Sequence, residues 1–385
     1  MLNRRAFIHT AAAFGLFSTH PALTVAAAPT DKRLVVIVLR GGLDGLDAVQ
    51  PIGDPGFAEL RPQLEKIGPA PAVPLDDYFH LHTALQPLQP WFAARELSFL
   101  HAVSTPYRNR SHFEAQDTLE QGGIRPGSID TGWVNRLISL AGNKRMEFGA
   151  DIGTGDSLLL RGPAEHLNVY PESETDFWKN STQFLRMMYA EDAGFKATFE
   201  RIESANAPGM QVENVDKGVS AREIASLAAK LLSGESRIAS FSLYGWDTHL
   251  QQNIRLTKSL ESLVSALQAL KTGLGNDWSR TAVVAVSEFG RTARFNGTLG
   301  TDHGTGGLAL LAGGLMANGQ GGKVLSTKWP GVGADQLYEG RDLAATDDVR
   351  RYLGWLIAGL FNLSQDTVTR QIFPDADLGA RLKLI

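Results

Sequence analysis

The chain has 385 residues, with 37 Lys and Arg against 41 Asp and Glu, a formal net charge of −4 and no cysteine. The absence of cysteine excludes disulfide scaffolds, thiolate zinc sites, iron–sulfur clusters and cysteine nucleophiles. The nearly balanced charge gives no general electrostatic case for nucleic-acid binding. The length allows two or three average domains or one large α/β domain.

Residues 1–28 have the pattern of an export signal, with a basic start, an apolar stretch and a run of small residues at 25–28. The pair Arg4 and Arg5, followed by Phe7, resembles a twin-arginine signal, although an ordinary secretory signal with two arginines is the alternative. We expect the twin-arginine export machinery as a partner and a periplasmic or secreted protein. No stretch of about 18 apolar residues follows, so we expect no stable membrane anchor.

In chain order, the rest alternates between predicted strands and helices. Short, continuous apolar runs predict buried strands at residues 34–39, 97–103, 237–243 and 281–286. Helices are predicted over about 84–94, from Ser111 onward, over about 256–270 and over about 347–361. Residues 304–317 are predicted to form a buried strand and turn.

This alternation predicts an α/β fold with a doubly wound, mostly parallel central sheet and helices on both faces. We expect residues 29–385 to form a single domain of this kind. Residues 157–220 are predicted to be a helical insertion or lid, with helices at 174–190 and 192–205.

Polar side chains follow each of the four predicted strands, where ligands bind in open α/β sheets. Asp44 follows the first strand between two glycines, so it is either a metal ligand or a turn residue that caps its own loop. Asp247 and His249 follow the third strand. In extended chain, residues two apart point the same way, as two ligands of one ion require.

Two further carboxylates and a histidine lie after the fourth strand. Glu288 ends a buried strand, where an unpaired carboxylate is costly, so either Arg291 or a cation is expected to pair with it. Asp302 and His303 are adjacent, and either they bind neighbouring ions or one orients the other through a hydrogen bond. A cysteine-free site built from carboxylates and imidazoles fits divalent Zn, Mn, Mg or Ca.

Ser111 is the best candidate for a nucleophile. It lies at a predicted helix start, where backbone N–H groups favour a phosphate or sulfate group, and Arg108 and Arg110 add anion recognition. The alternative is a serine that only caps the helix.

The chain contains, in this order, the motifs LRGGLDGLD, YRNRSHFEAQD, TGWVNRL, GWDTH, SEFGRT and TDHGTGG. These six motifs resemble those of the bacterial family called domain of unknown function 1501. The resemblance extends from about residue 34 to the final helix. That family resembles a distant branch of the alkaline phosphatase and sulfatase superfamily. The resemblance implies an alkaline phosphatase-like fold with divalent metal at the strand ends and a hydroxyl nucleophile at a helix start.

Carried over by motif, the resemblance assigns Asp44, Asp247 and His249 to metal and Ser111 to the nucleophile. The superfamily pattern Asp-His-Gly is replaced by Glu288-Phe289-Gly290, which puts one of two expected ions in doubt. Asp302 and His303 either substitute for that pair or supply the final metal histidine.

The sequence thus predicts an exported metal-dependent hydrolase that cleaves phosphate or sulfate esters of a small molecule or a polymer. Arg108 or Arg110 would stabilise charge in the transition state. The competing hypothesis is a non-catalytic envelope or secreted binding protein that keeps the fold. A mutase-like phosphoryl transfer is a third, less favoured option.

Overall fold

The computed structural model describes residues 30–62, 64, 72–141, 146–153, 157–169 and 219–385. The predicted export signal and the helices predicted at 174–190 and 192–205 lie outside these residues. Within the described ranges, no helix is long and apolar enough to span a membrane.

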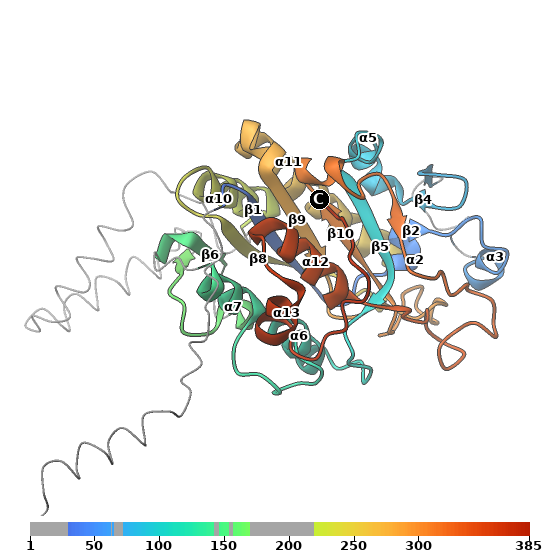
Figure 1. Ribbon diagram of the computed structural model, residues 1–385. Helices are drawn as coiled ribbons and strands as arrows, with labels where there is room; N and C mark the ends of the chain where they lie inside the picture. The colour runs from blue at the N-terminus through green and yellow to red at the C-terminus, as the bar shows by residue number, and fades with distance from the viewer. Residues whose placement is uncertain (1–29, 63, 65–71, 142–145, 154–156, 170–218) are drawn as a thin grey trace, which may run out of the picture.

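A central β-sheet runs through the molecule (Figure 1). Its strands follow the order β11-β5-β10-β9-β1-β8-β6-β7, with β12 also paired to β5. The strand bounds are β1 Arg33–Arg40, β5 Leu97–Ser104, β6 Gly149–Ile152, β7 Leu167–Val169, β8 Ile238–Tyr244, β9 Thr281–Val286, β10 Gly307–Ala312, β11 Val324–Leu325 and β12 Asp347–Asp348. β10 is antiparallel to both β5 and β9. Every other described pair in this sheet is parallel.

Both faces of this sheet are covered by helices, as the uninterrupted apolar strands require. Along β1, Leu34 and Val36 pack into one hydrophobic core, whereas Val35 and Ile37 pack into the other. The first core is covered by α6 His112–Gln121, α7 Trp133–Leu140 and α12 Val349–Phe361, and α12 lies in front of the sheet in Figure 1. The second is covered by α10 Ala221–Ser233 and α11 Gln252–Leu274. The predicted doubly wound fold class is confirmed.

The helix predicted over 84–94 is divided into two elements. A 3₁₀ helix, η1 Thr83–Leu88, contains Pro87, and α5 Gln89–Ala93 begins with Pro90 in its first turn. Proline lacks the N–H needed inside an α-helix but is tolerated at its first positions. The prolines therefore set the boundary between the two elements.

Smaller elements complete the described chain. A second sheet has the order β2-β4-β3. Its strands and the short helices beside it are β2 Val49–Gln50, β3 Val73–Pro74, β4 His80–Leu81, α2 Gly45–Ala48 and α3 Phe57–Leu60. A helix of three residues, α13 Gln365–Thr367, follows α12. Of the predicted insertion, residues 157–169 form the 3₁₀ turn η3 Leu158–Leu160 and the strand β7, which pairs with β6 at the edge of the main sheet.

The topology brings the predicted functional loops to one edge of the sheet. β1, β5, β8 and β9 are parallel and therefore end at the same edge. β10 runs in the opposite direction, so the loop that precedes it, with Asp302 and His303, reaches the same edge. The loops after the four strands and the loop before β10 consequently meet there.

Candidate metal centre

Three side chains from different loops bring possible ligand atoms together at this edge. One atom each from His112, Asp247 and His303 lies within 4.8 Å of the others. The His303 Nε2 atom is 3.0 Å from the Nε2 atom of His112 and 3.0 Å from that of His249. The Nε2 atom of His249 is also 3.0 Å from Asp247 Oδ1. We call His112, Asp247, His249 and His303 the four-residue cluster.

The backbone positions these side chains through close approaches that only glycine permits. Gly41, directly after β1, has a φ of +129°, and a Cβ there would lie 2.4 Å from the Asp247 backbone nitrogen. A Cβ on Gly304, directly after His303, would lie 2.4 Å from the backbone of Arg291. These glycines allow the loops after β1, β8 and β9 to pack against one another beneath the cluster.

The other ring nitrogen of each histidine is held by a group that can only accept a hydrogen bond. His112 Nδ1 lies 2.8 Å from Glu288 Oε1. His249 Nδ1 lies 3.0 Å from Asp302 Oδ1. His303 Nδ1 lies 3.0 Å from the carbonyl oxygen of Arg110. These partners favour a proton on Nδ1 in all three rings, because carboxylates and carbonyls cannot donate, although Asp247 Oδ1 also lies 3.0 Å from His249 Nε2.

In this tautomer, the Nε2 lone pair of His303 faces those of His112 and His249. Bare nitrogens at 3.0 Å repel unless a proton or a cation lies between them. Burial and the neighbouring His112 lower the pKa of His303, which disfavours a proton on the central ring. A hydrogen bond to Glu288 raises the pKa of His112, which favours a second proton on that ring. Such a proton would lie between His112 and His303 and would leave the contact between His249 and His303 without one. One cation shared by all three rings satisfies both contacts.

The distances also suit a single small ion. With Zn–N bonds of about 2.0–2.1 Å, the edge of a coordination tetrahedron is about 3.3 Å. The remaining contacts of the cluster are 3.3 Å between His303 Nε2 and Asp247 Oδ1, and 3.5 Å between His112 Nε2 and Asp247 Oδ2. Metal-binding histidines in proteins almost always donate their second N–H to a carboxylate or carbonyl. His112, Asp247 and His303 therefore fit a divalent metal, and His249 lies beside them, in contact with Asp247 and His303.

Arg291 keeps the carboxylate of the cluster charged. Its side chain is buried, and its Nη1 atom donates to Asp247 Oδ1 at 2.6 Å. Burial raises the pKa of Asp247, but the hydrogen bond from Arg291 and its charge outweigh that effect and lower the pKa overall. The expected pairing of Arg291 with Glu288 is wrong, because Arg291 contacts Asp247 instead.

Glu288 lies behind His112 rather than beside an ion. Its carboxylate is buried and accepts hydrogen bonds from Gly41 N, His112 Nδ1 and Gln116 Nε2 on Oε1, and from Ser287 Oγ on Oε2. Burial raises its pKa, but the bonds from His112 and Gln116 outweigh burial and lower it. Glu288 thus does not pair with Arg291, one of its two alternative partners, and it lies where it orients His112.

We expect the substitution Glu288→Gln to weaken metal binding about 10- to 100-fold, as changes behind a ligand histidine typically do. The amide has nearly the size of the carboxylate but lacks the charge that holds the His112 proton on Nδ1. Metal affinity measured by competition with a chromophoric chelator tests this expectation. Glu96→Gln is the matched control, because Glu96 pairs with Lys271 and Trp278 far from the cluster. Equal affinity in both variants would contradict the role assigned to Glu288.

Asp302 contacts a histidine, but not the one considered as its partner from the sequence. Its Oδ1 accepts from His249 Nδ1 and from Asn296 Nδ2, so it orients a histidine rather than facing the cluster. The histidine it orients is His249 and not its neighbour in sequence, His303.

Asp44 is held in a buried polar network apart from the four ligand atoms. Its Oδ1 caps α2 by accepting from Asp47 N, and its Oδ2 accepts from Arg61 Nη2 and Gln252 Nε2, each at 2.9 Å. Side chains of Asp44 and Arg61 are 1% and 0% exposed, so this is a fully buried ion pair. Removing one partner of such a pair typically costs about 3–5 kcal/mol of stability. The structure therefore supports the capping role for Asp44.

Two of the predicted metal ligands, Asp44 and Glu288, have no free carboxylate oxygen. The oxygens of Asp44 and Glu288 are engaged as described, and Phe289 places an apolar ring beside the cluster. Its ring centroid is 4.8 Å from that of His112 and 5.1 Å from that of His303. Phe289, at the position where the superfamily pattern has a histidine, thus packs its ring against two histidines of the cluster.

Ser111 and the two arginines lie on the loop that joins β5 to α6. Ser111 is the N-cap of α6, but its side chain makes no capping hydrogen bond. Arg108 Nη1 donates to Ser104 Oγ at 3.3 Å and to the carbonyl of Tyr107 at 2.9 Å. Arg110 pairs with Glu339 and Asp342. Both guanidinium groups thus have protein partners, and their catalytic role stays a prediction.

A family model described as "Protein of unknown function (DUF1501)" matches residues 160–351. The chain belongs to the DUF1501 family. The matched region includes the motifs with Asp247, His249, Glu288 and His303, whereas Asp44 and Ser111 lie before it. The family predicted from the motifs is confirmed. No curated protein matches the chain.

Solved structures with a similar arrangement share little sequence with this DUF1501 protein. An alkaline phosphatase superfamily protein from Vibrio parahaemolyticus is 13% identical, with 81% of this chain and 69% of that chain covered and a TM-score of 0.36. The C-terminal periplasmic domain of EcEptC from Escherichia coli is 12% identical, with 92% and 90% covered and a TM-score of 0.38. The lipoteichoic acid synthase LtaP from Listeria monocytogenes is 10% identical, with 78% and 68% covered and a TM-score of 0.38.

The sequence did not predict the roles that two residues, His112 and Arg291, have in the structure. His112 was present in the motif YRNRSHFEAQD, but its neighbour Ser111 was singled out instead. His112 is the first residue of α6, directly after the polar loop of β5, and this position at the common sheet edge is the signal that could have identified it. Arg291 was one of two alternative partners considered for Glu288, and no sequence pattern indicated Asp247 as its partner.

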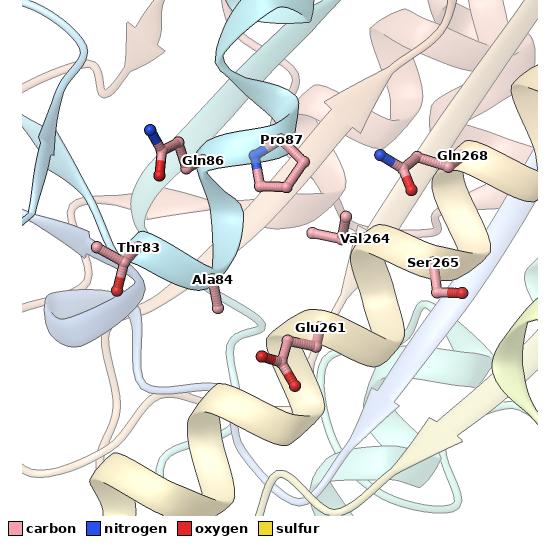
Figure 2. A pocket seen from close by; sticks show the side chains of 8 residues that line it. All are labelled: Thr83, Ala84, Gln86, Pro87, Glu261, Val264, Ser265 and Gln268. Carbon is pink, nitrogen blue, oxygen red and sulfur yellow. The ribbon is translucent and has the colours of Figure 1, made fainter. Parts of the chain in front are cut away.

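One pocket of this DUF1501 protein lies away from the four-residue cluster, between η1 and α11. Figure 2 shows η1 and α11 with side chains on either side of a groove of about 520 Å³. Its lining is Thr83, Ala84, Gln86, Pro87, Glu261, Val264, Ser265 and Gln268. None of the four cluster residues lines this groove, so it is separate from the candidate metal centre.

Proposed function

We propose that this protein is an exported, metal-dependent hydrolase that cleaves phosphate or sulfate esters. The observation that carries the proposal is the convergence of three imidazole Nε2 atoms and one carboxylate, with each Nδ1 atom held by an acceptor. This donor arrangement is costly without a cation and well suited to one.

The donor set narrows the choice of metal. Three imidazole nitrogens and one carboxylate suit Zn or Mn, whereas Ca and Mg prefer oxygen ligands. When bound, such an ion supplies Lewis-acid chemistry: it polarises an ester oxygen and lowers the pKa of a bound hydroxyl group. We therefore propose one Zn²⁺ or Mn²⁺ per chain, held by His112, Asp247, His249 and His303.

Ser111 is the proposed nucleophile. It precedes the ligand His112 directly, and the first N–H groups of the ten-residue helix α6 are next to it. These N–H groups and the helix dipole favour the negative charge of a phosphate or sulfate group. The Ser111 Oγ atom would bond to phosphorus or sulfur as the bond to the alcohol oxygen breaks, and water would then release the acid.

The export proposal rests on the sequence of residues 1–28. A twin-arginine signal would deliver a folded chain, with its metal already bound, to the periplasm or to the outside of the cell. Fusion of residues 1–35 to a reporter, with Arg4 and Arg5 each changed to lysine as the control, would test this route.

Turnover of aryl phosphates and aryl sulfates tests the proposed activity. We expect the metal-depleted protein to be inactive on both, and Zn²⁺ or Mn²⁺ to restore hydrolysis of one class. An absence of turnover by a chain that has bound metal would contradict the hydrolase and would favour the competing hypothesis, a binding protein that keeps the metal centre.

A further inference from the structure

Large apolar side chains are exposed around the candidate metal centre more than elsewhere. In the described residues, nine large hydrophobic side chains are exposed. Six of them belong to the loops and helix starts that carry the four-residue cluster, or contact those loops: Phe113, Tyr244, Leu250, Ile254, Leu299 and Tyr338. The other three are Ile52, Ile124 and Met146. We call the six the apolar rim.

One side of the rim is formed by α6 and the end of β8. Phe113 follows the ligand His112 directly and is 85% exposed. Tyr244 is 70% exposed and is the register partner of Arg40. Arg40 in turn bonds Gln116, one turn after His112 on α6. Both aromatic rings therefore lie on the His112 side of the centre.

The opposite side is formed next to His249. Leu250 follows His249 and forms a β-bridge with Leu299. The loop of Leu299 is fastened to His249, because Asn296 Nδ2 and Thr298 Oγ1 both donate to the His249 carbonyl. Ile254 lies one turn further along α11. These three aliphatic side chains are 41–50% exposed.

Tyr338 completes the rim beside the third ligand. Its ring lies 5.9 Å from the guanidinium carbon of Arg110, whose carbonyl accepts from His303 Nδ1. His112 and His249 thus each have an exposed apolar side chain directly after them in the chain, and Tyr338 is linked to His303 through Arg110. Clusters of exposed apolar side chains are uncommon on soluble proteins and typically mark binding surfaces.

We propose that the substrate is an amphiphile: a phosphate or sulfate ester of a long-chain alcohol. This inference rests on the proposed function. The anionic head group complements the metal centre, and the alkyl chain contacts apolar side chains of the rim next to the ligands. The rim thereby distinguishes long-chain esters from the esters of small polar alcohols, which would leave it exposed to water.

Binding of alkylphosphonates tests this substrate class without requiring turnover, because the phosphonate carbon–phosphorus bond resists hydrolysis. We would titrate the zinc-loaded protein with methyl-, butyl- and octylphosphonate below their micellar concentrations, using calorimetry. The expected Kd falls about two- to fourfold for each added methylene that contacts the rim. A Kd that does not change with chain length would overturn the proposal and leave the hydrolase intact.

Variants identify the surface that binds the chain. Phe113→Ser and Leu250→Ser are expected to weaken octylphosphonate binding at least about fivefold and to leave methylphosphonate binding unchanged. Ile124→Ser is the matched control, because Ile124 is exposed but is not part of the rim. If the control has the same effect as the rim variants, the rim is not the binding surface. If no phosphonate binds the zinc-loaded protein, the proposed function itself fails.

Discussion

The variant His303→Ala is expected to lose its metal. The His303 Nε2 atom lies within 3.3 Å of donor atoms of all three other cluster residues, so its removal takes away the central ligand. We expect metal affinity to fall by more than the roughly 10- to 100-fold that is typical for residues behind the ligands. Hydrolysis should be lost together with the metal.

Thermal unfolding provides an independent measurement of this effect. An ion at 100 times its Kd stabilises the folded state by about 2.7 kcal/mol, so zinc should raise the Tm of the wild-type protein. Zinc should not raise the Tm of His303→Ala. The control is His166→Ala, since His166 is half-buried and its Nδ1 atom lies 3.3 Å from the Ala164 carbonyl oxygen. A zinc-dependent rise in Tm for His303→Ala equal to that of the control would contradict the assignment.

The second large effect is expected for Ser111→Ala. If Ser111 is the nucleophile, kcat should fall on the order of 10³-fold or more, with the metal content unchanged. Replacing an N-cap serine usually costs about 0.5–2 kcal/mol of stability. The Ser111 side chain makes no capping bond, so the Tm of this variant should stay close to that of wild type.

The matched control is Ser128→Ala, which removes a serine hydroxyl that bonds the Arg125 carbonyl on an exposed turn. Its kcat and metal content should both equal those of wild type. Undiminished hydrolysis by Ser111→Ala would exclude Ser111 as the nucleophile and leave the metal centre to activate water directly. A loss of metal together with activity would show that Ser111 supports the ligands instead.

The convergence of the loops could be predicted from sequence because it follows from strand direction. Parallel strands must end at one edge, so polar residues after β1, β5, β8 and β9 had to meet there. The pair Asp247 and His249 also followed from local geometry, since residues two apart share a side of extended chain. These inferences need only local patterns and one rule of topology.

The roles within the site could not be predicted, because contacts between distant residues decide them. Glu288 is 176 residues from His112, and Asp302 is 53 residues from His249. From sequence, a carboxylate that binds an ion and one that orients a histidine are indistinguishable. Asp44 is only 17 residues from Arg61, yet no periodic pattern indicates that this arginine is buried against it.

Phe289 shows how sequence and structure combine. The sequence identified it as a departure from the superfamily pattern and put one ion in doubt. The structure gives the physical reason, because the Phe289 ring packs against two ligand histidines and the neighbouring Glu288 is fully engaged by hydrogen bonds. We therefore predict a centre with a single ion.

Metal content tests the central claim most directly. Elemental analysis of the purified protein, before and after loading with Zn²⁺ or Mn²⁺ and removal of free metal, gives the number of ions bound per chain. We predict one equivalent after loading, which the variant His303→Ala does not retain. A content near zero that loading does not change would contradict the metal centre, and two retained equivalents would contradict its single-ion form.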